Sequence, residues 1–177
     1  GVAEREDLMG RLDIIQGTLA KGFGVVGGYV AGTESMCDFI RSYGDGFIFS
    51  SSMPPAVAAG ALASVKYVRE HNELREQHQE RAATLKQRLT DVGILVMPSV
   101  THIVPVMVGD PVLCKQASDE LLYNHNIYVQ PINYPTVPRG TERLRFTPTP
   151  LHNDELMDHL VSSLQKVWSQ LGLKQAA

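Results

Sequence analysis

The segment from Pro54 to Leu89 changes composition midway, and this change constrains the fold more than any other feature of the 177-residue chain. Two prolines open the segment, which suits the first turn of a helix, where a backbone N–H has no partner. Residues 56–65 are rich in alanine and apolar on several faces, so we expect them to be buried. Residues 67–89 are charged and carry scattered leucines. The shift predicts one long helix that leaves one core and enters another, with a domain boundary near residues 70–75.

Before this boundary the chain alternates short apolar runs with turns. Residues 12–15 predict a buried strand and residues 27–32 a second strand, because glycines bound that short apolar run. Thr33 can cap a helix over 34–42. Residues 47–49 are a further strand candidate. We therefore expect residues 1–72 to form part of one α/β domain together with the start of the interdomain helix.

After Gly93 the pattern changes to that of a small α+β domain. The last helix is the clearest element, because Asn153 is a suitable N-cap and leucines recur behind it at helical spacing. We expect residues 73–177 to form a three- or four-stranded sheet covered by helices. The predicted strands are 94–97, 103–108, 127–130 and 144–147, and the predicted helices are 112–124 and 154–171.

Composition excludes several classes of protein. The 44% of hydrophobic residues supports a real core, and the net charge of −3 gives no sign of a nucleic-acid partner. Cys37 and Cys114 lie far apart and fit a reduced compartment better than a disulfide scaffold. No apolar run approaches the roughly 20 residues that span a bilayer. Residues 1–7 resemble neither a signal peptide nor a natural start, so we expect a piece of a longer soluble enzyme.

A single lysine, Lys21, stands in a turn of small residues directly after the first predicted strand. A lysine in such a turn is most often a solvated surface charge. Its small, uncharged neighbours nevertheless suit a crowded pocket, where a lysine amine can form a Schiff base with a carbonyl cofactor, usually pyridoxal 5′-phosphate (PLP). Thr18 and the backbone N–H groups of residues 17–24 could hold the phosphate, because glycines let the main chain approach an anion closely.

Two neighbouring patterns admit competing interpretations. Residues 22–27 match the dinucleotide-binding pattern G-x-G-x-x-G, which requires a strand before it and a helix that begins inside it. Here the pattern runs into a predicted strand, so NAD(P) binding ranks last among the alternatives. Ser50, Ser51 and Ser52 precede the two prolines, where they either cap the helix or form a phosphate site with its first N–H groups.

The second half contains a stiff loop and an unusual arginine. Residues 133–140 include two prolines that restrict the backbone, and the loop carries tyrosine, threonine and arginine side chains that could position a substrate. Arg145 lies in an otherwise apolar strand, where it either points to solvent at a sheet edge or binds a carboxylate. Arg143 shares its face, and we expect it to be solvated. The six histidines have no spacing that completes a metal site, so we predict no metal.

Several of these segments together resemble one family. Residues 17–24, 47–55 and 145–150 are similar to the α-oxoamine synthases, which are fold-type I PLP-dependent transferases that join an amino acid to an acyl-CoA. Residues 126–140 resemble the branch that makes 5-aminolevulinate, and this segment separates that branch from its sisters. The similarity covers essentially the whole chain. It implies an α/β fold, with the C-terminal part of a large PLP-binding domain followed by a small α+β domain.

The resemblance also implies a reaction and a cofactor. The branch condenses glycine with succinyl-CoA to 5-aminolevulinate, CoA and CO2, the first step of tetrapyrrole and haem biosynthesis. By position, Lys21 would hold PLP and then remove the glycine α-proton. Thr18 would bind the PLP phosphate within its own subunit. Arg145 matches the arginine that binds the glycine carboxylate, and Thr136 matches the residue that contacts the succinyl carboxylate.

Ser50 and Ser51 match positions that reach the phosphate of the neighbouring subunit, so the resemblance implies a homodimer with its active site at the interface. The family often has threonine at these positions, which keeps the hydroxyl. It also implies upstream residues that cannot be matched here: an aspartate at the pyridine nitrogen, a histidine near the ring and further succinyl-CoA contacts. We therefore expect this chain alone to be inactive.

Two other functions remain open. One is a sister enzyme that uses another amino acid or acyl-CoA, such as one that makes 8-amino-7-oxononanoate. The other is a non-catalytic partner subunit, against which Lys21 argues, because such subunits can lose the Schiff-base lysine. No membrane partner is expected. For localisation we expect a bacterial cytoplasm, or the mitochondrial matrix in a eukaryote.

Overall fold

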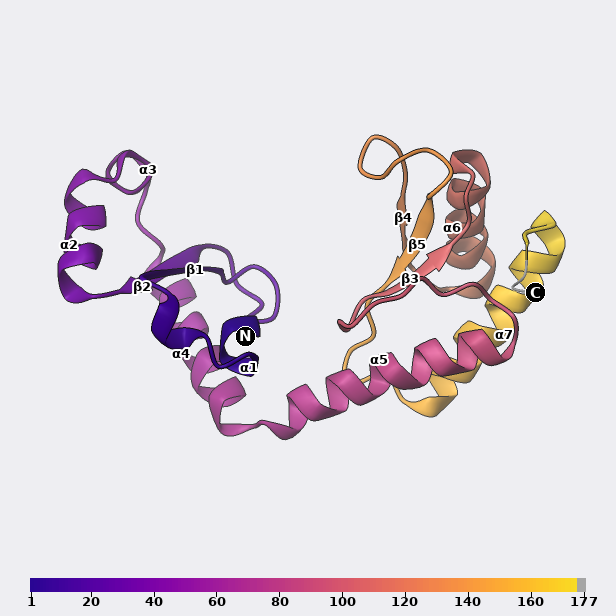
Figure 1. Ribbon diagram of the computed structural model, residues 1–177, viewed down its shortest axis with the longest axis horizontal. Helices are drawn as coiled ribbons and strands as arrows, with labels where there is room; N and C mark the ends of the chain where they lie inside the picture. The colour runs from indigo at the N-terminus through magenta and orange to yellow at the C-terminus, as the bar shows by residue number, and fades with distance from the viewer. Residues whose placement is uncertain (175–177) are drawn as a thin grey trace. The chain divides into compact units, whose positions relative to one another are not determined.

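The computed structural model describes residues 1–174, which divide into two compact units (Figure 1). The first unit is Gly1–His71, and the second begins at Asn72. The assignment of residues 1–72 to a large PLP-binding domain and of 73–177 to a small domain stays a prediction. Within residues 1–174, no helix is both long and apolar enough to cross a membrane.

The first unit is built on a two-stranded antiparallel sheet, drawn in indigo to violet in Figure 1. Gly17 stands opposite Tyr29 in this sheet, and a Cβ atom at Gly17 would collide with the tyrosine ring. The glycine therefore makes room for its cross-strand partner. The elements of this unit are α1 (Val2–Arg5), a 3-10 turn (Met9–Arg11), β1 (Ile14–Thr18), β2 (Gly28–Gly32), α2 (Glu34–Tyr43), α3 (Asp45–Ile48) and α4 (Pro55–Glu70).

The local predictions for β2 and α2 are confirmed. β2 occupies Gly28–Gly32, and α2 begins after Thr33, whose Oγ1 accepts a hydrogen bond from the Met36 N–H at 3.4 Å. The strand predicted at residues 47–49 is wrong, because this stretch belongs to α3 and the turn that follows it. Two phenylalanines and an isoleucine favour a strand, but the hydrogen bonds that follow Gly44 close a helical turn instead.

Burial in the first unit is much lower than predicted. In α4 only Ala61 is buried, although residues 56–65 were expected to lie in a core. The predicted buried strand at 12–15 becomes β1, which begins at Ile14, and that side chain is 44% exposed. Both predictions are wrong for the same reason. An apolar sequence shows what a segment can bury, whereas burial itself requires a neighbouring element to cover it.

The single long helix predicted across the boundary is also wrong, because the chain forms two helices, α4 and α5. α4 ends at Glu70, and His71 leaves the helical region with a ψ of 73°. The Asn72 side chain accepts from the Arg75 guanidinium at 2.9 Å and donates to Glu76 at 2.7 Å. Asparagine side chains compete with the helical ladder through such local hydrogen bonds, which favours a break here.

The second unit consists of a three-stranded antiparallel sheet, in the order β3-β5-β4, packed with three helices (Figure 1). Its core combines side chains from all of these elements except β4. The elements are α5 (Glu73–Asp91), β3 (Val104–Met107), α6 (Pro111–His125), β4 (Gln130–Ile132), β5 (Arg143–Phe146) and α7 (Asp154–Leu171). The largest fully buried side chains include Trp168, Leu85, Leu89, Ile94, Leu121, Leu144, Met157 and Leu164.

Most predictions for the second unit are confirmed, and two are wrong. α7 has the predicted bounds, and the Asn153 Oδ1 caps it by accepting from the Leu156 N–H at 2.9 Å. Residues 94–97 make one isolated bridge, between Val96 and Val106, in place of a strand. The strand predicted at 127–130 is displaced to Gln130–Ile132, because residues 126–129 instead lie along α6, where the Ile127 N–H donates to the Leu121 carbonyl.

Candidate active site

Lys21 lies exposed in the loop between β1 and β2. Leu19 anchors this loop: its side chain is buried, its N–H donates to the Gly27 carbonyl at 2.9 Å, and its carbonyl accepts from the Val25 N–H at 3.1 Å. The Lys21 carbonyl accepts from the Gly24 N–H at 3.0 Å. Gly24 and Gly27 have φ angles of +71° and +107°, which side-chain-bearing residues rarely adopt. The lysine is therefore presented by a hydrogen-bonded loop.

Thr18 and Lys21 belong to the same loop, which begins where β1 ends. The Thr18 Oγ1 accepts a hydrogen bond from the Ala20 N–H at 3.2 Å, which orients the hydroxyl within the loop. The loop thus offers a primary amine and a hydroxyl three positions apart. The strand β2 follows residues 22–27, so no helix begins inside the glycine pattern. The dinucleotide-binding interpretation therefore lacks the structural context that it requires.

The serine cluster does not cap α4. Its N-cap residue is Pro54, and no side chain caps this helix. The Ser50 hydroxyl donates to the Phe47 carbonyl at 3.2 Å, and both Ser50 and Ser51 are exposed. The capping interpretation is therefore wrong. A phosphate-binding role for Ser50 and Ser51 stays a prediction.

In the second unit, Thr136 lies exposed in the loop that joins β4 to β5. Its N–H donates to the Asn133 carbonyl at 3.0 Å, and the Asn133 Nδ2 donates to the Pro111 carbonyl at 3.1 Å. The Arg139 guanidinium stands 4.4 Å from the centroid of the Tyr134 ring, a cation–π contact. The loop is therefore restrained by its own contacts and by the hydrogen bond from Asn133 to α6, in addition to its prolines.

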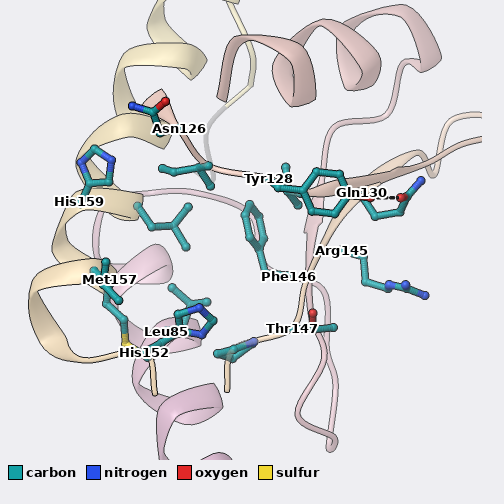
Figure 2. Close-up of a pocket in the computed structure, with 15 residues that line it drawn as sticks. Leu85, Asn126, Tyr128, Gln130, Arg145, Phe146, Thr147, His152, Met157 and His159 are labelled. Atoms are coloured by element: carbon teal, nitrogen blue, oxygen red, sulfur yellow. Dashed lines mark hydrogen bonds between the residues drawn. The ribbon is translucent and has the colours of Figure 1, made fainter. Parts of the chain in front are cut away.

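Arg145 lies on the middle strand of the three-stranded sheet and not at an edge. Its neighbours Leu144 and Phe146 are buried, so strand alternation turns the arginine to the opposite, exposed face. Figure 2 shows the Arg145 side chain pointing away from Met157 and the apolar interior. Arg143 is partly buried and its Nε donates to the Thr141 carbonyl at 2.8 Å, so the expectation that it is solvated is wrong.

A cavity of about 490 Å³ lies in the second unit, and Arg145 is among the residues that line it (Figure 2). Phe146, Leu85 and Met157 form its apolar wall. Its two histidines are used locally: His152 Nδ1 accepts from the Thr149 N–H at 2.8 Å, and His159 Nε2 contacts the His125 carbonyl at 2.9 Å. Residues 1–174 contain no group of three or more histidine, cysteine or carboxylate side chains that could hold a metal ion.

Sequence reasoning missed Glu142, which is completely buried. A signal was available, because strand alternation places residue 142 on the same face as the buried Leu144 and Phe146. Glu142 lies near Cys114. Burial raises the pKa of the Cys114 thiol to about 11, and the negative charges of Glu142 and Asp110 act in the same direction. This thiol is therefore unreactive at neutral pH.

Comparison with known proteins places these features in a family. The family model described as aminotransferase class I and II matches residues 1–164. 5-Aminolevulinate synthase 1 of Cereibacter sphaeroides is 57% identical over 176 residues, which are 99% of this chain and 43% of that protein. The mitochondrial 5-aminolevulinate synthase of Kluyveromyces lactis is 54% identical over 98% of this chain and 31% of its own length. The chain thus spans less than half the length of these relatives.

Solved structures give the same likeness in three dimensions. A serine palmitoyltransferase from S. paucimobilis with bound PLP and myriocin superposes with a TM-score of 0.88 and 28% identity, over 97% of this chain and 44% of that one. An 8-amino-7-oxononanoate synthase from Francisella tularensis superposes with a TM-score of 0.73 and 22% identity, over 90% of this chain and 45% of that one, which indicates a shared fold.

Proposed function

The chain belongs to the aminotransferase class I and II family and has the fold of PLP-dependent fold-type I enzymes, and on that premise we propose that it is part of a 5-aminolevulinate synthase. The full-length protein would condense glycine with succinyl-CoA to 5-aminolevulinate, CoA and CO2. The observation that carries this proposal is the exposed Lys21 on its anchored loop, in a chain 57% identical to a 5-aminolevulinate synthase over almost its whole length.

The first unit has groups that fit PLP. Lys21 offers a primary amine for the cofactor aldehyde, and Thr18 offers a hydroxyl for the phosphate from the same loop. The hydroxyls of Ser50 and Ser51 are exposed, as contact with the phosphate of a neighbouring subunit in a homodimer would require. When bound, PLP supplies an electron sink for the bonding electrons of the substrate α-carbon.

Two side chains would act on glycine: Arg145 would bind its carboxylate, and Lys21 would accept its α-proton. The Arg145 guanidinium can donate two parallel hydrogen bonds to the glycine carboxylate, and this fixes the direction of the α-C–H bond. The Lys21 Nζ would then accept the α-proton as general base. The exposed position of Arg145 between two buried neighbours supports this role, because the guanidinium is presented outward from a rigid strand.

Thr136 would contact the succinyl carboxylate of the acyl-CoA. Its place in a restrained loop supports this role, because a preformed loop loses little conformational entropy when it binds a substrate. Arg139 adds a positive charge to the same loop. For localisation, relatives include bacterial proteins and a mitochondrial one, and a bacterial cytoplasm is our proposal for this chain.

The test is an assay of the full-length protein with glycine and succinyl-CoA. We expect 5-aminolevulinate to form, and Lys21→Ala to abolish it, whereas Lys66→Ala in α4 serves as the matched control. Borohydride reduction followed by peptide mapping should place the reduced cofactor on Lys21. Product from another amino acid and acyl-CoA pair only would identify a sister enzyme. Absence of a reducible cofactor adduct on Lys21 would support the non-catalytic subunit.

A further inference from the structure

Glu142 is the only charged side chain among the buried residues of the described part of the chain. It directly precedes β5, the strand that carries Arg145. A buried carboxylate costs free energy unless hydrogen bonds replace its lost hydration. Core packing alone would favour an apolar side chain of similar size at this position. The burial of Glu142 therefore requires another explanation.

The hydrogen bonds of Glu142 connect two segments. Its Oε2 accepts from the Gly140 N–H at 2.9 Å, at the end of the β4–β5 loop. Its main-chain carbonyl accepts from the Val108 and Gly109 N–H groups, both at 2.9 Å, just after β3. Gly140 has a φ of +81°, a conformation that a hydrogen bond on its N–H helps to hold. The residue thus fastens the end of the loop to the sheet.

The loop is fastened at its other end by Asn133, whose side-chain amide donates to the Pro111 carbonyl at 3.1 Å. Between these two anchors lies Thr136, exposed and held by a single main-chain hydrogen bond to Asn133. Only the Glu142 anchor involves an ionisable side chain. One of its oxygens, Oε1, is buried without a hydrogen-bond partner. The Asn133 Oδ1 is likewise buried without a partner, so both anchors have this cost, but only at Glu142 does it fall on an ionisable group.

We propose that Glu142 is a positioning residue for the acyl-CoA substrate: its carboxylate holds Gly140, and through the loop it holds Thr136 in the conformation that receives the acyl carboxylate. This rests on the proposed function, in which Thr136 contacts that carboxylate. The role is indirect, because the Glu142 side chain is sealed from solvent and cannot itself touch the substrate.

The first test measures the loop itself by amide hydrogen exchange in the full-length protein. Glu142→Leu keeps the volume but cannot accept the Gly140 N–H, so peptides covering 133–141 should exchange at least about tenfold faster. Glu142→Gln keeps an acceptor oxygen and should stay close to the wild-type rate. Ser118→Ala is the control, since it loses a different buried hydrogen bond, to the Val129 carbonyl at 2.8 Å. Unchanged exchange in Glu142→Leu overturns the proposal.

The second test separates the two substrates in the full-length enzyme. Glu142→Leu should raise KM for succinyl-CoA by about tenfold and change KM for glycine less than twofold. Glu142→Gln should bring KM for succinyl-CoA most of the way back to the wild-type value. A merely structural role predicts a lower melting temperature and an equal effect on both substrates, and that result would refute the positioning role. If the wild type makes no 5-aminolevulinate, the proposed function fails, whereas the exchange experiment still decides whether Glu142 holds the loop.

Discussion

The two units differ sharply in how they are held together. In the second unit, side chains from α5, α6, α7 and the sheet form one continuous core. Among residues 1–71, by contrast, only Leu19 and Ala61 are buried. Aromatic side chains of the first unit are largely exposed, such as Tyr43 at 71% and Phe49 at 85%. Within this chain the second unit thus contains a complete core, whereas the first, which the sequence predicts to be part of a larger domain, buries little apolar surface.

The ion pairs show the same difference. In the first unit, pairs such as Arg5–Glu6 and Arg41–Asp38 join residues one to three positions apart. In the second unit Arg88 reaches across from α5 to α7, where it contacts Asp154 at 2.7 Å and Asp158 at 2.6 Å. Ion pairs between residues close in sequence add little to the stability of a tertiary fold, whereas the Arg88 cluster joins two helices that are distant in sequence.

The proposed site residues are distributed over both units. The proposed Schiff-base lysine lies on a loop in the unit that buries little. The loop and strand proposed to bind the substrates belong to the unit with the core.

The largest effect should appear when the units are expressed separately. A fragment that begins at Asn72 should unfold in one cooperative transition, because it contains a complete core. A fragment of residues 1–71 should show no cooperative transition, because it buries too little apolar surface to offset its chain entropy. Urea titration followed by circular dichroism measures both. A cooperative transition in the first fragment would contradict the comparison.

Within the second unit, Leu164→Ala should reduce the free energy of unfolding by about 2–5 kcal/mol, because Leu164 is fully buried in the core and the change leaves a cavity. Leu151→Ala is the matched control. That leucine is 87% exposed, and the change should stay within about 0.5 kcal/mol. Both values come from urea unfolding of the fragment that begins at Asn72. Similar losses in the two variants would argue against a continuous core.

The loss of a helix cap should reduce global stability more in the second unit than in the first. Asn153→Ala removes the side-chain acceptor of the Leu156 N–H and should cost about 1 kcal/mol of global stability. Thr33→Ala removes the corresponding cap of α2 in the first unit. In the whole chain it should reduce helicity without moving the main unfolding midpoint. A shift of this midpoint by Thr33→Ala would show that the units unfold together.

The smallest effect concerns acid stability. Hydrogen bonds from Arg81 and Thr84 lower the pKa of Glu80 from 4.5 to about 2 in the folded chain. The unfolded chain therefore binds this proton first as the pH falls. The contribution of Glu80 to stability is present above pH 5 and is lost between about pH 4.5 and pH 2. Glu80→Gln should flatten this part of the stability profile, whereas the control Glu155→Gln should not.

Several parts of the fold and site follow from the sequence because they depend on neighbours along the chain. The Asn153 cap and the leucines behind it predicted α7 to the residue. The position of Lys21 after a strand, in a turn of small residues, was also predicted. The environment of Glu142 could have been predicted from strand alternation, yet nothing near it in the sequence indicated that its oxygen would bind Gly140.

Other features depend on partners far along the chain, and these predictions failed or stayed open. The alanines of α4 are apolar in any context, but the first unit covers only one of them. Arg145 could have stood at an edge or in the centre of a sheet. The pairing of β5 with both β3 and β4 decided this.

Local signals thus determined the caps of α2 and α7, the lysine loop and the prolines that stiffen the loop carrying Thr136, because each arises from interactions within a few residues. The tertiary structure alone decided what is buried: the core of the second unit, the outward face of Arg145 and the anchor at Glu142. Burial and strand pairing join segments that are tens of residues apart. No short-range pattern specifies which of those segments will meet.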